Sequence, residues 1–147
     1  MSLDIRNFTR RVPARGVPFS RIAEAVLPGW DISLVFAGER RAQNLNIALR
    51  GKDYVPNVLS YETGGPRPKA AAGSGEIIIC PAVARQQAPA YGMPYADFVA
   101  YLFIHGLLHL KGYPHGATME KYERGNLARF GFKSPSFTNG TTHRNRH

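Results

Sequence analysis

Three of the five histidines, His105, His109 and His115, fall within the stretch HGLLHLKGYPH. On a helix, the rings of His105 and His109 lie on one face about 6 Å apart, because the two residues are four positions apart. Two imidazoles at this spacing can bind one Zn²⁺ at about 2.0–2.1 Å each. Gly112 and Pro114 then allow the chain to turn, which can bring His115 to the same point. Three neutral nitrogens with a fourth position open are typical of a catalytic zinc site.

The alternative interpretation is that these histidines serve the fold and bind no metal. One histidine on an apolar helix is usually a hydrogen-bonded core residue, and two at this spacing indicate a metal only weakly. The third histidine makes one zinc ion per chain the better interpretation, although imidazole also suits nickel and other divalent ions. Thiolate ligands are not available, since Cys80 is the single cysteine. His143 and His147 are expected to be tail residues with no role.

The residue after His105 is Gly106. In the protease motif H-E-x-x-H this position holds the glutamate that acts as general base. The sequence therefore argues against peptide hydrolysis by that mechanism and leaves a hydrolase of another substrate open. Glu76 and Asp53 are the candidate acid or base groups, but a salt-bridged surface carboxylate is the more common role of such residues.

Alternation and helical periodicity predict the elements that must position these rings. The histidine helix begins near Pro94 and ends at Lys111–Gly112. GEIIIC, residues 75–80, is expected to be a central strand because both of its faces are apolar. We expect strands at 3–8, 30–38, 55–62 and 75–80, and helices at 22–27, 39–49, 81–88, 94–111 and 118–130. This order predicts one compact α+β domain, residues 1–132, with helices packed on a mixed four-stranded sheet and the metal site on the last core helix.

The formal charge of +9 is concentrated at the ends of the chain. Residues 1–21 carry a net +4 and residues 133–147 a net +3, so the segment 133–147 is predicted to be a basic, disordered tail. A basic total favours a polyanionic partner such as RNA. No apolar run approaches the ~18 residues that span a bilayer, and the first residues do not resemble a signal peptide. With one cysteine no internal disulfide can form, and a cytoplasmic context is expected.

Three blocks of the sequence resemble the YbeY family of bacterial metal-dependent endoribonucleases of rRNA maturation. HGLLHLKGYPH resembles the family's histidine signature, LNIALRGKDYVPNVLSYE (45–62) its arginine block, and GEIIIC (75–80) the strand that follows. Together the blocks extend the match over residues 3 to 131, in the family's order. In the arginine block, the matching positions are Asn46, Arg50, Gly51, Lys52, Asp53, Asn57, Val58, Leu59 and Ser60.

The resemblance implies a function and a set of site residues. It implies zinc-dependent cleavage of single-stranded RNA in 16S 3′-end maturation, ribosome biogenesis and quality control, with rRNA and the small ribosomal subunit as partners. The metal would be held by His105, His109 and His115. Arg50 and His109 would be catalytic, and Arg50 with Asn57 and Ser60 would bind substrate. Without the resemblance, the sequence predicts only that the positive charge of Arg50 interacts favourably with the C-terminal end of a helix dipole.

The chain departs from the family pattern before its third histidine. The family has aspartate there, and this chain has Pro114. A carboxylate at that position would hydrogen-bond a metal ligand or bound water, so that support is expected to be lost. A second interpretation therefore stays open, namely a non-catalytic ribosome-assembly factor that binds RNA and uses zinc as a structural ion.

Overall fold

The computed structural model describes residues 2–11 and 13–136. The strands are β1 (Ser2–Asn7), β2 (Asp31–Phe36), β3 (Val58–Thr63) and β4 (Ser74–Ile79). The helices are α1 (Phe19–Val26), α2 (Glu39–Arg50), α3 (Pro81–Gln87), α4 (Tyr95–Lys111) and α5 (Ala117–Arg129), with a 3₁₀ turn, η1 (Ala88–Tyr91), after α3. The predicted order of elements is confirmed, apart from the 3₁₀ turn, which the sequence analysis did not separate.

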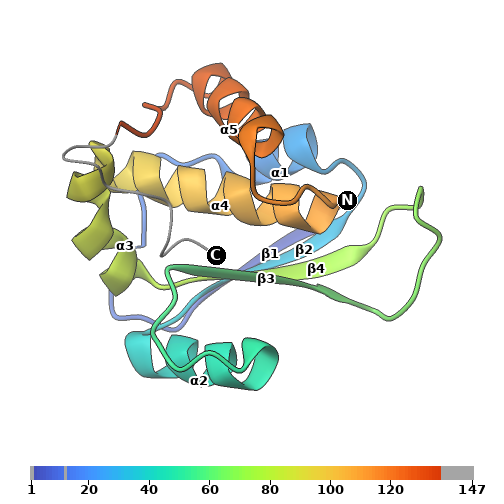
Figure 1. Ribbon diagram of the computed structural model, residues 1–147, viewed down its shortest axis with the longest axis horizontal. Helices are drawn as coiled ribbons and strands as arrows, with labels where there is room; N and C mark the ends of the chain where they lie inside the picture. Colours follow the sequence, from blue (N-terminus) through green and yellow to red (C-terminus); the bar gives the residue numbers. More distant parts are fainter. Residues whose placement is uncertain (1, 12, 137–147) are drawn as a thin grey trace.

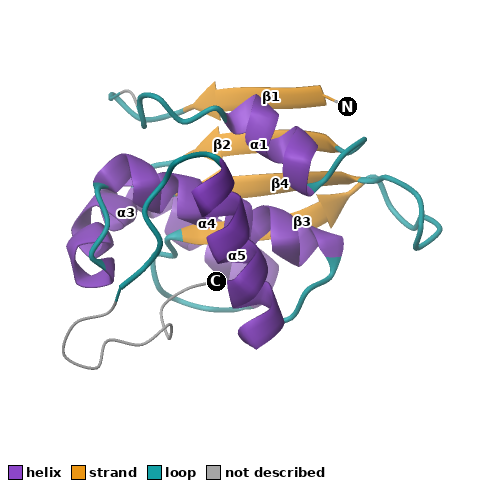
Figure 2. Ribbon diagram, turned by 90° about the horizontal axis from the view of Figure 1, so that it is seen from above, coloured by secondary structure: helices purple, strands orange, loops and turns teal. Residues whose placement is uncertain are grey.

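The four strands form one mixed sheet in the order β1-β2-β4-β3. β1, β2 and β4 are parallel, and β3 pairs with β4 in the antiparallel direction. β4 therefore lies inside the sheet, as its apolar sequence predicts, while β1 and β3 form the two edges (Figure 2).

Helices cover the two faces of the sheet unequally (Figure 1). α1, α4 and α5 lie on one face, where Ile77 and Ile79 of β4 join the main core. α2 lies on the other face, over a smaller cluster that includes Leu59 and Ile78. The alternation of side chains along β4 assigns its residues to these two cores, so a run of three isoleucines is buried on both sides.

α4 is the central helix of the main core and is buried along most of its length. It lies close to β4 at Gly106, where an added Cβ would come within 3.1 Å of Ile77 Cγ2. A residue without a side chain therefore permits this approach. Among the described residues, no helix combines the length and apolar character needed to cross a bilayer.

The end of the described chain contacts the rest of the domain. The backbone N–H of Lys133 donates a hydrogen bond to Asp97 Oδ2 (2.7 Å), and that of Ser136 donates to the carbonyl of Tyr91 (2.8 Å). These contacts attach residues 133–136 to the domain near the start of α4. The rest of the predicted tail, residues 137–147, lies outside the described residues, as do His143 and His147.

Candidate metal centre

His105 lies in the middle of α4 and is completely buried. Its Nδ1 is 2.5 Å from Oε2 of Glu123, a buried carboxylate on α5. A carboxylate at Nδ1 holds the proton on that nitrogen and leaves Nε2 as the atom with the lone pair. The contact between α4 and α5 thus sets both the tautomer and the direction of the ring.

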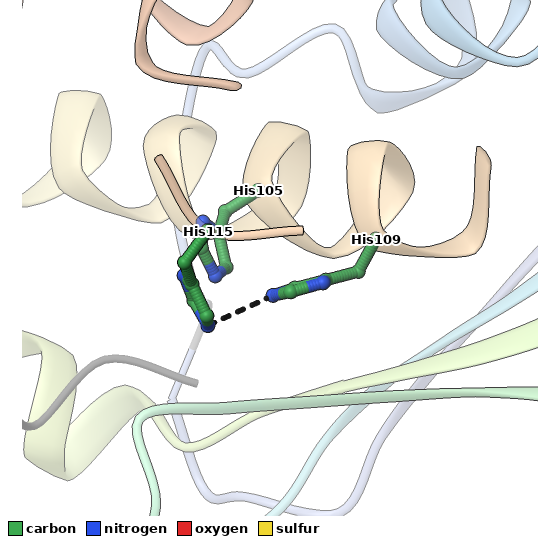
Figure 3. A group of neighbouring side chains, drawn as sticks. All are labelled: His105, His109 and His115. Atoms are coloured by element: carbon green, nitrogen blue, oxygen red, sulfur yellow. Dashed lines mark hydrogen bonds between the residues drawn. The ribbon is translucent and has the colours of Figure 1, made fainter. Parts of the chain in front are cut away.

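His109 and His115 complete a group of three imidazoles (Figure 3). Their Nε2 atoms are 3.2 Å apart, and one nitrogen from each of the three rings lies within 4.8 Å of the others. Two nitrogens that each bind a tetrahedral zinc at about 2.05 Å are separated by roughly 3.3 Å. The spacing of His109 and His115 fits a shared ion, and imidazole nitrogens are donors that suit zinc and other divalent metals.

The protonation state of His109 also suits a metal ligand. Partial burial, followed by the neighbouring rings of His105 and His115, lowers the pKa of His109 to about 4. Its imidazole is therefore neutral at pH 7 and offers a lone pair. The guanidinium of Arg50 contributes to the lowered pKa of His109, which indicates that this charge lies near the ring.

The turn after α4 brings His115 back to the helical pair. Gly112 adopts a left-handed conformation with a φ of 110°. Its N–H donates to the carbonyl of His109 (3.0 Å), and the N–H of Tyr113 donates to that of Leu108 (3.1 Å). These two bonds form a Schellman motif, which ends the helix and reverses the chain. The predicted role of Gly112 is confirmed.

Two of the histidines, His109 and His115, line a cleft of about 360 Å³ at the β3 edge of the sheet, while His105 is buried behind them. α2 and α4 lie on opposite faces, and β3 is the edge strand between them. The end of α2 therefore meets the histidines around this edge. The cleft is lined by Arg50, Ser60, Tyr61, Glu62, His109, Leu110 and His115.

Arg50 is held at this cleft by residues of its own helix and the loop that follows. Its Nη1 donates a hydrogen bond to the Tyr54 hydroxyl (2.9 Å) and lies 3.4 Å from Oδ1 of Asn46. Asn46 is fully buried and donates to the backbone carbonyl of Tyr54 at 3.0 Å. This arrangement orients the guanidinium before any substrate binds.

Not every predicted substrate-binding residue reaches the cleft. Ser60 lines it, but Asn57 does not. The Asn57 side chain is buried, and its Nδ2 donates to Oε1 of Gln87 on α3 (2.9 Å). Its backbone carbonyl also accepts a hydrogen bond from the N–H of Cys80. This geometry indicates that Asn57 connects α3 to the start of β3, while its role in substrate binding stays a prediction.

The candidate acid and base groups are engaged elsewhere. Asp53 accepts a hydrogen bond from Gln43 (2.8 Å). Glu76 accepts one from the Tyr61 hydroxyl, and burial together with this bond raises the pKa of Tyr61 to about 12. The carboxylate that lines the cleft is Glu62, which the sequence analysis did not single out and which pairs with Arg67 at 2.9 Å.

Glu123 is the second residue that the sequence analysis missed. It lies four residues from both Met119 and Leu127, and all three are buried on one face of α5. An acidic residue within such an apolar stripe needs a partner, because an unpaired buried charge is costly. Its partner is the metal-centre residue His105. The carboxylate absent before His115, where Pro114 stands, therefore has a counterpart on α5 that supports a different ring.

Comparisons with known proteins agree with this geometry. The family model described as Endoribonuclease YbeY matches residues 5–130. Proteins named Endoribonuclease YbeY from Bdellovibrio bacteriovorus and Thiobacillus denitrificans are 35% identical over 107 residues and 36% identical over 129 residues. The alignments cover 73% of this chain and 65% of the Bdellovibrio protein, and 84% of this chain and 86% of the Thiobacillus protein.

A solved structure shares the fold. The solution structure of TM1509 from Thermotoga maritima aligns with a TM-score of 0.59 and 20% identity, over 87% of this chain and 88% of that one. At this identity the likeness concerns the fold alone. With the family model matching most of the chain, and with relatives above 30% identity, the chain belongs to the Endoribonuclease YbeY family.

Proposed function

We propose that this protein is a cytoplasmic, single-strand-specific endoribonuclease that cleaves phosphodiester bonds with one bound zinc ion. Its substrate would be rRNA of the small ribosomal subunit, in maturation of the 16S 3′ end and in ribosome quality control. The observation that supports this most is that His109 and His115, two of the three clustered imidazoles, line one open cleft together with Arg50. The family's name supplies the substrate class.

In this proposal His105, His109 and His115 would hold the ion, which would supply Lewis-acid stabilisation of the phosphate charge. Arg50 binds the same phosphate, because a guanidinium offers paired N–H donors that an ammonium cannot. The bond from Nη1 to Tyr54 already orients this group. Less side-chain entropy is therefore lost when the phosphate binds. The Ser60 hydroxyl, on the same cleft, is placed to hydrogen-bond the RNA backbone.

The test compares Arg50→Ala and His109→Ala with the wild type on an end-labelled RNA that contains the 16S 3′ region. Arg40→Ala is the matched control, because Arg40 is an exposed arginine on the same helix and does not line the cleft. Loss of one transition-state donor is expected to lower kcat by about 10²–10³. Arg50→Ala should show this loss with zinc still bound, and Arg40→Ala should not. A folded Arg50→Ala that cleaves at the wild-type rate contradicts the proposed cleft.

One observation favours a second candidate, an RNA-binding assembly factor with a structural zinc. His105 and Glu123 already connect α4 to α5, so a bound ion would strengthen that connection. Structural zinc sites are closed by four protein ligands, however, and here His115 is exposed and His109 lines a cleft. Zinc-loaded wild type that binds the RNA without cleaving it, and that loses thermal stability on chelation, would establish the second candidate.

A further inference from the structure

The sheet has a second crevice at the carboxyl ends of its parallel strands, where β1 and β2 lie side by side. β1, β2 and β4 are parallel, so their carboxyl ends lie at one end of the sheet. The chain leaves β1 toward α1, on the α4 face, and leaves β2 into α2, on the opposite face (Figure 1). Where neighbouring parallel strands send their connections to opposite faces, an open α/β sheet leaves a crevice in which ligands bind.

A cavity of about 460 Å³ occupies this place, and we name it the strand-end cavity. Its lining comes from the segments that follow β1, β2 and β4, at the end of the sheet where α3 lies (Figure 2). The volume falls within the range of small-molecule sites, about 300–1,000 Å³. The strand-end cavity and the metal cleft share no lining residue.

The charges around the strand-end cavity favour an anion. Arg10, Arg11 and Arg85 line it, against one acidic residue, Glu39. The Arg85 guanidinium carbon lies 4.1 Å from the centroid of the Tyr95 ring, so this side chain is supported from one side by an aromatic face. Arginine is the side chain best suited to phosphate, because its planar N–H groups match the spacing of two phosphoryl oxygens.

The remaining wall of the strand-end cavity is largely apolar. Pro13, Ala37, Pro81 and Ala82 contribute to it, and none of them brings a side-chain donor or acceptor. A small inorganic anion would leave this wall without a partner. A ligand that matches both parts has a charged phosphate and a flat ring whose faces can pack on apolar side chains, which a nucleotide provides.

We propose that the strand-end cavity binds a nucleoside phosphate, with the phosphate against Arg10, Arg11 and Arg85 and the base against the apolar wall. The same chemistry is offered by a free mononucleotide and by one nucleotide of an RNA chain. The first source is independent of the proposed nuclease activity, and the second rests on it, because the RNA would then contact the protein at a point outside the metal cleft.

The test measures binding of AMP, adenosine and a short 2′-O-methylated RNA oligonucleotide to the full chain by calorimetry, with and without zinc. The cavity variant is Arg11→Glu/Arg85→Glu. The control is Lys121→Glu/Arg124→Glu, which makes the same change of charge at two exposed positions on α5. We expect the cavity variant to bind AMP or the oligonucleotide at least about tenfold more weakly than the control does, since two charge-assisted phosphate contacts are removed.

The probes separate the two sources. Loss of AMP binding, with adenosine weak throughout, identifies a free nucleotide, and loss confined to the oligonucleotide identifies an RNA segment. Ala82→Leu keeps all three arginines and adds bulk to the apolar wall at an exposed position. It should weaken binding of the same probe, which keeps the proposal testable if the charge variant misfolds. Equal binding by the cavity variants and the control overturns the proposal. Because no arm measures cleavage, that result leaves the nuclease proposal to be judged separately.

Discussion

Replacement of Glu123 by glutamine tests how the metal centre is supported. The Glu123 carboxylate lies 2.5 Å from Nδ1 of His105, and the exposed fractions of the two side chains are 2% and 0%. Glutamine keeps an oxygen that can accept the Nδ1–H bond, so the ring keeps its tautomer. What Glu123→Gln removes is the negative charge that raises the basicity of the ring and offsets the charge of a bound cation.

The expected effect is a loss of metal affinity with the fold retained. Hydrogen-bond partners of metal ligands typically contribute 10–100-fold to affinity, which corresponds to about 1.4–2.7 kcal/mol. Because this contact is short and hidden from water, the upper half of that range applies to Glu123→Gln. Alanine at the same position would add about 1–3 kcal/mol of lost stability, because the Nδ1–H group would be buried without a partner.

The assay is a zinc titration in competition with a chromophoric chelator at pH 7. Glu24→Gln, the same chemical change at an exposed position on α1, is the control and should bind zinc as the wild type does. His105→Ala gives the zinc affinity that remains when one ligand is lost. If folded Glu123→Gln binds zinc with wild-type affinity, the proposed support of His105 by the carboxylate charge is refuted.

Three further predictions follow from individual contacts. The pKa of His109 is lowered to about 4 from an ordinary 6.5, so the metal-free protein should lose stability as the pH falls from 6.5 to 4. The reason is that the unfolded chain takes up a proton that the folded ring excludes. Thermal unfolding of His109→Gln should therefore depend less on pH than that of the wild type. Gly106→Ala should cost about 1 kcal/mol in denaturant unfolding, since crowding against Ile77 (about 1–3 kcal/mol) exceeds the gain in helix propensity, and a stabilised variant would contradict this. Asn46→Ala should lower stability by about 1–3 kcal/mol, because the carbonyl of Tyr54 loses its buried donor; unchanged unfolding would count against that role.

The sequence predicted well those features that depend on local pattern. The spacing of His105, His109 and His115, with a glycine between the last two, predicted the metal centre, and the structure brings all three rings together. The apolar faces of GEIIIC predicted a central strand, and β4 lies between β2 and β3. The start of the third strand was placed too early, at residue 55 in place of Val58, in a stretch where Pro56 has no N–H for pairing.

Features that depend on tertiary contacts could not be predicted from local sequence patterns. Glu123 is 18 residues from His105 in sequence, and no local rule connects the two. Its one sequence signal was a carboxylate on an apolar helix face. Asn57 was assigned to substrate because of its position in a motif, but burial and its bond to Gln87 place it inside the domain. The order of strand pairing also had to come from the structure, because it decides that the cleft opens beside β3.

The close approach of α4 to the sheet at Gly106 restricts what chemistry this scaffold can acquire by single substitutions. A glutamate at that position would reproduce the peptidase arrangement H-E-x-x-H in sequence, yet its Cβ would meet Ile77. A new proton-transferring side chain between the two helical ligands therefore has to displace Ile77 by a few tenths of an ångström in the core. Acquiring such a group between these ligands thus carries a cost in stability that is set by the packing of α4 on β4.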